Sequence, residues 1–195
     1  MKLSDKIFKK RRLSDYIMYT AVIIGGILLD QLTKVLAEVF LKSNGTFPII
    51  KNALHLTYVE NRGAAFGMLA DNRWLFMIVS VVAILVFGAY LYLGHAESTL
   101  SAVALAMMTS GGIGNMIDRI FRGYVIDFID FRLINFAVFN GADSLVCVGA
   151  GLLILSLLLG LRTDSENRGS GDGGKDGNNS GADGDGTADP GDGDI

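Results

Sequence analysis

The chain has 195 residues, of which 50% are hydrophobic and only 19% are charged. A typical soluble domain has about 25% charged residues. The charge is divided unevenly, because residues 163–195 hold nine acids, two bases and ten glycines, whereas residues 1–162 carry 15 bases and 11 acids. This composition excludes a nucleic-acid-binding module and a coiled coil. Because Cys147 is the only cysteine, a disulfide scaffold is excluded too, and its apolar surroundings predict a buried side chain.

Four apolar stretches are long enough to cross a membrane, which takes about 20 mostly apolar residues. They cover residues 16–38, 74–94, 99–117 and 144–161. The first stretch is too long for a cleaved signal peptide and is not followed by a cleavage site of small residues, so we expect a retained span. The third is rich in Gly, Ser and Thr, which is typical of a helix that packs closely against other helices.

The distribution of bases predicts the orientation of the spans. Six Lys and Arg side chains lie within residues 1–12, and such a cluster stays on the cytoplasmic side of the membrane. Four spans then place both termini in the cytoplasm, with residues 95–98 as a short cytoplasmic turn. The two long connections, residues 39–73 and 118–143, are therefore expected outside the cytoplasm.

Both outer connections contain sequence patterns of β-strands. Within residues 53–59, apolar side chains alternate with His55 and Thr57, and residues 124–139 are rich in Val, Ile and Phe. We expect a small extracytoplasmic β-sheet on the outer membrane surface. His55 falls on the polar face of its strand and is therefore predicted to be a surface residue. No neighbouring residues have metal-ligand spacing, so we expect no metal site there.

The acidic, glycine-rich residues 163–195 cannot bury a core and are predicted to be a disordered tail. The stretch from Asp183 has acids at the first and third positions of a calcium loop but lacks the loop's glycine and bidentate glutamate, so we expect no calcium site. The predicted fold is thus a mostly α membrane protein, with a four-span domain over residues 1–162 followed by the tail.

Charged residues inside or beside membrane spans mark function, because a charge in the bilayer core is costly. Here they gather toward the outer ends of the spans: Asp30, Lys34, Asp118, Arg119, Asp127 and Asp143. Some have structural explanations, since Asp30 and Lys34 have the spacing of a helical ion pair and Asp118 is placed to hold a neighbouring loop. Asp130 lies where water is available and is expected to be solvated.

Asp127 and Asp143 are harder to explain by structure alone, because one lies in the apolar run VIDFIDF and the other at the start of a helix. Two close carboxylates in a partly dry site share one proton. The ionised member can take a proton from water while the protonated member polarises a carbonyl group. The positive end of the fourth helix favours Asp143 as the base and Asp127 as the initial acid, but the pair titrates as a unit and this assignment stays open.

Five motifs resemble those of one known family. They are residues 30–34 (D-x-x-T-K), 61–67 (N-x-G-A-A-F-G), 112–119 (G-x-G-N-x-x-D-R), 125–128 (V-x-D-F) and 139–143 (F-N-x-A-D). In this order, among four spans, they resemble the bacterial lipoprotein signal peptidases, also called signal peptidase II. The resemblance covers roughly residues 15–162.

The resemblance implies an aspartic endopeptidase of the bacterial cytoplasmic (inner) membrane, without metal or cofactor, that cuts prolipoproteins before a diacylglyceryl-modified cysteine. The family's catalytic pair corresponds to Asp127 and Asp143. Its substrate-binding residues correspond to Asn61, Gly63, Asn115, Arg119 and Asn140. The residues expected to support the site are Asp30, Lys34, Asp118 and Ala142.

The expected partners are diacylglyceryl-modified prolipoproteins and membrane lipid, with no nucleic acid, and the protein is expected to be a monomer. Three other functions are alternatives to this one. A transporter or channel would use intramembrane acids as a proton relay, but its acids would be distributed across the membrane depth. A non-catalytic assembly protein gives no reason for two carboxylates in apolar surroundings. Another kind of intramembrane aspartyl protease remains open.

Overall fold

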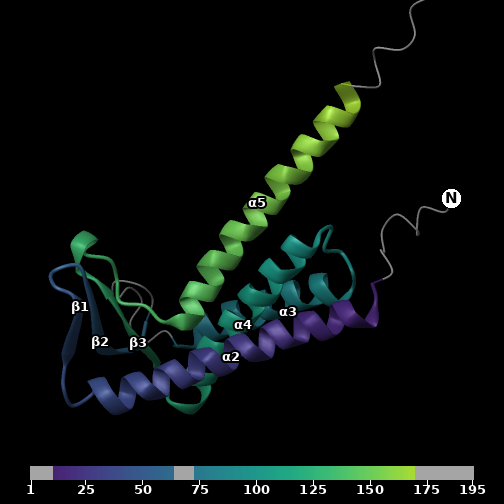
Figure 1. Ribbon diagram of the computed structural model, residues 1–195. Coiled ribbons are helices and arrows are strands. Elements are labelled where there is room, and N and C mark those ends of the chain that lie inside the picture. Colours follow the sequence, from purple (N-terminus) through teal and green to yellow (C-terminus); the bar gives the residue numbers. More distant parts are fainter. Residues whose placement is uncertain (1–10, 64–72, 170–195) are drawn as a thin grey trace, which may run out of the picture. The chain divides into compact units, whose positions relative to one another are not determined.

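The computed structural model describes residues 11–63 and 73–169. In chain order the elements are α2 (Leu13–Leu41), β1 (Thr46–Ile50), β2 (Leu54–Asn61), α3 (Arg73–Tyr92), α4 (Thr99–Phe121), β3 (Val125–Phe131), the 3₁₀ helix η2 (Arg132–Ile134) and α5 (Gly141–Gly169) (Figure 1). The chain divides into two compact units, residues 1–159 and 160–195, and the first holds the sheet and the candidate site.

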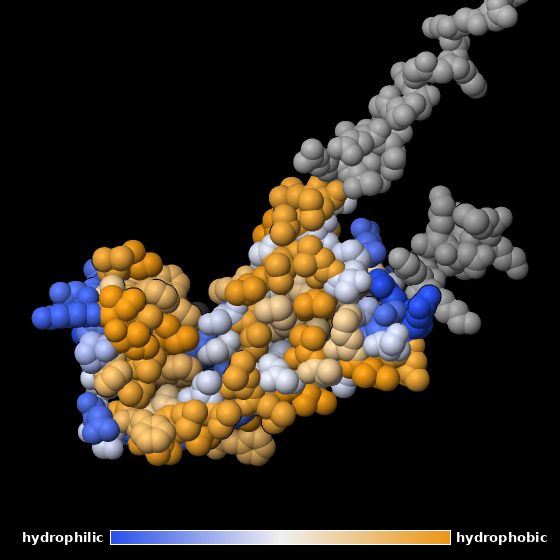
Figure 2. Space-filling view, in the orientation of Figure 1, coloured by the Kyte–Doolittle hydropathy of each residue, from blue (hydrophilic) through white to orange (hydrophobic). Residues whose placement is uncertain are grey.

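Four helices in the described residues are long and apolar enough to cross a membrane, which confirms the four predicted spans. Few residues of the α3 and α5 spans are buried within the protein, although both spans are strongly apolar. Figure 2 accordingly shows a largely hydrophobic surface over the helices on the face in view. Such extensive apolar surface suits contact with lipid and would be a liability in water.

Helix α4 is the most buried span and packs against both α2 and α3. Its buried residues are mostly small, including Ala102, Ala106 and Gly111. Small side chains let helix backbones approach closely, and the Ser110 hydroxyl donates a 3.0 Å hydrogen bond to the carbonyl oxygen of Ile23 on α2. The Gly, Ser and Thr content of this span therefore serves close packing, as predicted.

The sheet has three antiparallel strands in the order β1-β2-β3. It packs against the C-terminal part of α2, where Ala37 and Leu41 meet Ile126 of β3 in one apolar cluster (Figure 1). Strand β2 was predicted but β1, which contains Pro48, was not. Proline lacks a backbone N–H and is tolerated in an edge strand, which is the place of β1 in this sheet.

The region 124–139 forms one strand, β3, followed by η2 and a single bridge between Ile129 and Phe139. The predictions for two sheet residues were wrong. His55 is only 8% exposed and Asp130 only 9% exposed. His55 on β2 and Asp130 on β3 are cross-strand neighbours. Strand β1, which was not predicted, pairs with the other edge of β2, so His55 also lies opposite Pro48.

The prediction of disorder from residue 163 onward was also wrong in part. Helix α5 continues through Gly169, so residues 163–169 are helical. Each residue added to an existing helix gains one hydrogen bond while only one residue is ordered, so extension is much easier than nucleation. Residues 162–168 contain no Gly or Pro that would end the helix. The candidate calcium loop at Asp183 lies outside the described residues, and a functional boundary after residue 162 stays a prediction.

Close packing between α4 and α5 predicts different effects for two nearby glycines. A Cβ atom added at Gly149 would lie 2.8 Å from the carbonyl oxygen of Ala104, whereas one at Gly151 meets no described atom within 4 Å. Gly149→Ala should therefore destabilise the protein by about 1–3 kcal/mol. Gly151→Ala should be neutral or stabilise it by up to about 1 kcal/mol. Thermal unfolding in detergent measures both, and equal midpoints would contradict this description of the contact.

Candidate active site

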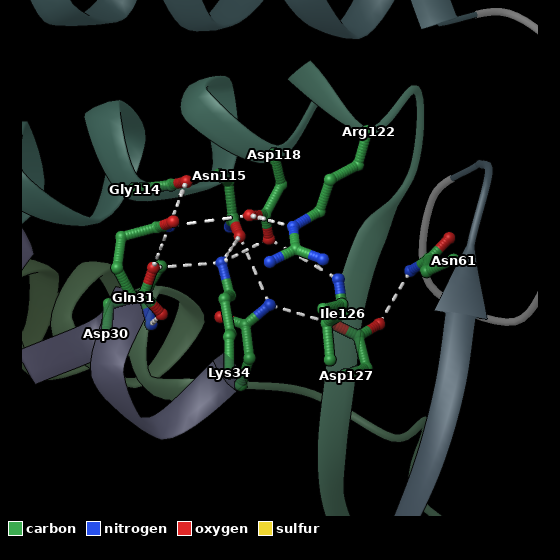
Figure 3. Close-up of polar contacts among 12 residues, drawn as sticks. Asp30, Gln31, Lys34, Asn61, Gly114, Asn115, Asp118, Arg122, Ile126 and Asp127 are labelled. Atoms are coloured by element: carbon green, nitrogen blue, oxygen red, sulfur yellow. Dashed lines mark hydrogen bonds and ion pairs between the residues drawn. The ribbon is translucent and has the colours of Figure 1, made fainter. Parts of the chain in front are cut away.

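The Lys34 side chain forms a buried ionic cluster between α2 and α4 (Figure 3). Its Nζ atom lies 2.9 Å from Oδ2 of Asp30 and 2.9 Å from Oδ2 of Asp118, and all three side chains are 0% exposed. Nζ also donates a 3.0 Å hydrogen bond to Oδ1 of Asn115. An ammonium group has three N–H donors, and all three have acceptors here, which is what a buried charge requires.

Asp30 connects this cluster to the beginning of α5. Its Oδ1 atom accepts a 2.8 Å hydrogen bond from the backbone N–H of Ala142. The contact needs a glycine at position 114, because a Cβ atom there would lie 2.5 Å from Oδ2 of Asp30. Gln31 joins the cluster through its Nε2 atom, which lies 3.2 Å from Oδ2 of Asp30 and 3.4 Å from Oδ1 of Asp118. No sequence pattern indicated this role of Gln31.

Asp118 connects the same cluster to the beginning of β3. Its Oδ2 atom accepts a 3.4 Å hydrogen bond from the backbone N–H of Ile126, and Nε of Arg122 lies 3.6 Å from its Oδ1 atom. Arg122 also pairs with Glu38 at 2.5 Å. Arg122 was not predicted as a site residue, although its spacing of four residues from Asp118 was a usable signal.

Asp127 lies on β3, and its carboxyl group accepts two hydrogen bonds from amide side chains. The Nδ2 atom of Asn61 donates to Oδ2 at 2.8 Å (Figure 3). The Nδ2 atom of Asn140 donates to Oδ1 at 2.7 Å. Burial raises the pKa of Asp127 to about 6, and the negative charge of Asp143 acts in the same direction. The hydrogen bonds from Asn61 and Asn140 favour the ionised form and oppose this rise in pKa.

Asp143 lies in the first turn of α5 and also accepts two hydrogen bonds. Nδ2 of Asn115 donates to its Oδ1 atom at 2.7 Å, and the backbone N–H of Asn140 donates to Oδ2 at 3.3 Å. In return, Oδ1 of Asn140 accepts a 2.9 Å hydrogen bond from the backbone N–H of Asp143. This reciprocal pair caps the N-terminus of α5. Asn140 therefore donates to both carboxyl groups, through its side chain to Asp127 and through its backbone to Asp143.

The hydrogen-bond partners fix the orientation of both amide groups. The oxygen of Asn115 accepts from Lys34, so its NH₂ group faces Asp143. The oxygen of Asn140 accepts from the backbone of Asp143, so its NH₂ group faces Asp127. In the described part of the chain, these two asparagines contact the carboxyl groups and are not among the residues that line the pocket beside them.

Asp127 and Asp143 open onto one pocket of about 420 Å³. Three of the residues predicted to bind substrate also line it: Asn61, Gly63 and Arg119. The guanidinium group of Arg119 lies 5.5 Å from the centre of the Phe76 ring. The remaining wall comes from the loop before α5 and from its first two turns: Phe136, Ala137, Val138, Phe139, Ser144 and Cys147.

The prediction that Cys147 is buried was wrong, because its side chain is exposed and lines this pocket. The apolar residues around it in the sequence belong to a span with few buried residues. An apolar neighbourhood in a membrane span therefore does not distinguish burial in the protein from exposure to lipid or to a pocket.

The fold and the site together define a multi-pass membrane protein with a pair of carboxyl groups in a pocket near one end of its spans. Comparison with known proteins identifies the family, because the family described as Signal peptidase (SPase) II matches residues 22–159. The chain belongs to the signal peptidase II family and is a transmembrane peptidase. This membership decides against the transporter, channel and assembly-protein alternatives.

Curated relatives carry the name lipoprotein signal peptidase. The one from Caldanaerobacter subterraneus subsp. tengcongensis is 48% identical over 136 residues, which cover 70% of this chain and 92% of the relative. The one from Halothermothrix orenii is 46% identical over 140 residues, which cover 72% and 94%. A solved structure, described as a bacterial membrane enzyme determined by the in meso method at 2.3 Å resolution, is 28% identical with a TM-score of 0.70, covering 88% of this chain and 99% of that chain.

The buried cluster predicts that Lys34 is far more important for stability than Lys42. Both ammonium groups face two carboxylates, but the side chain of Lys42 is 50% exposed and its partners, Glu38 and Glu60, lie 3.4 and 3.5 Å away. Lys34→Met leaves two buried carboxylates without their cation and should cost about 3–5 kcal/mol. Lys42→Met should cost far less, because water screens an exposed ion pair. Unfolding in detergent compares the two variants, and a similar small loss in both would contradict the assignment.

Proposed function

We propose that this protein removes signal peptides from prolipoproteins, cutting before the diacylglyceryl-modified cysteine, and that Asp127 and Asp143 carry out the cleavage as an aspartic pair. The observation that carries the proposal is that both carboxyl groups open onto one pocket while Asn140 donates a hydrogen bond to each. The names of the relatives support the class of substrate.

The environments of the two carboxyl groups support different roles for them. Asp143 lies in the first turn of a helix, where the helix dipole favours a negative charge. Asp127 is buried, and its raised pKa makes it the member that holds the shared proton. Asp143 is therefore the proposed base and Asp127 the proposed acid, with apparent pKa values that belong to the pair.

The proposed reaction uses one water molecule and returns the pair to its starting state. Asp143 takes a proton from the water as the water oxygen bonds to the scissile carbonyl carbon, and Asp127 gives its proton to the carbonyl oxygen. The tetrahedral intermediate then collapses as the C–N bond breaks. The proton on Asp143 passes to the leaving nitrogen, and one hydroxyl proton of the intermediate returns to Asp127.

The remaining site residues divide into two proposed groups. Asn61, Gly63 and Arg119 line the pocket, where amide and guanidinium N–H groups can hold the carbonyl groups of an extended peptide. Asn115 and Asn140 hold the two carboxyl groups in place. Beneath them Asp30, Lys34, Asp118 and the backbone of Ala142 form the support.

We also propose an inner-membrane location with both termini in the cytoplasm and the pocket near the outer face. The bases within residues 1–12 support a cytoplasmic N-terminus. With four spans, the C-terminal end of α4 and the N-terminal end of α5, which both contribute to the pocket, then lie toward the outer face. Residues 163–195 contribute no residue to the pocket among those described and are proposed to lie outside the catalytic part of the chain.

Replacing either proposed catalytic carboxyl group should abolish cleavage. Neither Asp127→Asn nor Asp143→Asn can exchange a proton with water or with its partner, so each should lose more than the roughly 10²–10⁴-fold typical of an auxiliary acid or base. The measurement is turnover of a diacylglyceryl-modified prolipoprotein by purified protein. Asp130→Asn is the matched control, because that carboxyl group contacts Thr57 and Arg132 on the sheet, and it should retain most activity. Near-normal turnover by Asp127→Asn would refute the assigned pair.

The raised pKa of Asp127 predicts how the rate depends on pH. The proposed acid must be protonated, so kcat/KM should fall as the pH rises through about 6. Asn61→Leu removes a hydrogen bond that stabilises the ionised form, which raises the pKa of Asp127 and moves this alkaline limb to higher pH. Asp130→Asn should leave the limb in place. A limb that Asn61→Leu leaves unmoved, or moves to lower pH, would contradict the assigned acid.

A further inference from the structure

The part of α5 that lines the pocket presents small side chains next to the proposed base. Asp143, Ser144 and Cys147 all line the pocket. A spacing of four residues is about one helical turn, so Cys147 lies about 6 Å along the helix axis from Asp143, on the same side of the helix. The hydroxyl of Ser144 already donates to the carbonyl oxygen of Asn140 at 2.9 Å. This side of the pocket therefore offers space rather than additional polar groups.

The loop before α5 presents bulkier side chains on the facing wall. The loop before α5 contributes Phe136, Val138 and Phe139, and the rings of Phe136 and Phe139 contact each other edge to face with centres 5.8 Å apart. A substituent that enters the pocket beside Asp143 therefore meets aromatic side chains from the loop and small side chains from the helix. The size of the residue at position 147 decides how much room remains between them.

The direction of α5 indicates which part of a substrate would pass Cys147. The helix enters its apolar span from the pocket, so Cys147 lies further into the span than Asp143. A signal peptide is apolar and lies in the bilayer, so the segment just before the scissile bond runs from the carboxyl pair into the membrane. Small side chains on a membrane helix allow another chain to approach its backbone closely.

We propose that Ser144 and Cys147 form the surface against which the signal-peptide residues just before the scissile bond pack, and that Cys147 limits the size of the residues accepted there. This inference rests on the proposed function and extends it to substrate specificity. The fit is steric, since enlarging position 147 closes the space between α5 and the aromatic loop.

The sole cysteine of the chain makes a selective chemical test possible. Alkylation of the full-length protein with N-ethylmaleimide should lower kcat/KM on a diacylglyceryl-modified prolipoprotein about 10-fold or more. Methyl methanethiosulfonate, which adds only a small S-methyl group, should have much less effect. The matched control is the double variant Cys147→Ala, Val148→Cys, because Val148 is 52% exposed and is not among the described pocket residues. Alkylating that variant should leave kcat/KM within about 2-fold of its unmodified value.

Protection from alkylation gives a second readout that does not depend on turnover. The Asp127→Asn variant should bind the prolipoprotein substrate without cleaving it. In this variant, substrate at ten times its Kd should slow the alkylation of Cys147 about 10-fold. The thiol in the Val148→Cys control should react at the same rate with and without substrate. A rate at Cys147 that substrate leaves unchanged would overturn the proposed contact.

Substrate size then tests specificity directly. Cys147→Phe should lower kcat/KM about 10-fold more for a substrate with Leu before the scissile bond than for one with Gly. Cys147→Gly should bring the kcat/KM values of these two substrates closer together than they are in the unmodified protein. Equal losses of kcat/KM for both substrates would overturn the inference. A loss that depends only on the length of the substrate's acyl chains would also overturn it, because the space beside Cys147 would then hold the lipid. If the unmodified protein cleaves neither substrate, the proposed function itself fails, whereas cleavage that ignores position 147 refutes only this inference.

Discussion

The buried ammonium group of Lys34 is the constraint on which the rest of the site depends. A cation with no exposure to solvent must have every donor occupied, and Lys34 meets this requirement only if Asp30, Asp118 and Asn115 all converge on it. Asp30 also accepts from the backbone at the start of α5, and Asp118 from the backbone of β3. One charge thus sets the relative positions of α2, α4, the first turn of α5 and the sheet.

The same cluster determines how the two carboxyl groups of the pocket are presented. Because the oxygen of Asn115 is taken by Lys34, its NH₂ group must face Asp143. Asn140 then bridges Asp143 and Asp127 with donors that have no freedom to reverse. A rigid set of donors holds the two acids in place, and the raised pKa of Asp127 follows mainly from its burial, with the negative charge of Asp143 acting in the same direction.

The sequence by itself determined the spans and pointed to the carboxyl pair. An uninterrupted apolar length specifies a membrane helix without reference to its neighbours, so α3 and the apolar part of α5 were found close to their observed bounds. Asp127 and Asp143 stood out for a related reason, since a charged side chain in an apolar run is costly wherever that run finally packs. The five motifs added the family and the identities of the other polar residues.

The tertiary structure alone decided which side chains are covered and which groups meet. Strand β1 forms despite Pro48 because β2 supplies its hydrogen-bonding partner, and the resulting three-stranded sheet buries His55 and Asp130. Cys147 reaches the pocket because the loop before α5 leaves space beside that helix. Burial and hydrogen bonding depend on segments far apart in the sequence, and local composition cannot specify which of them will pack together.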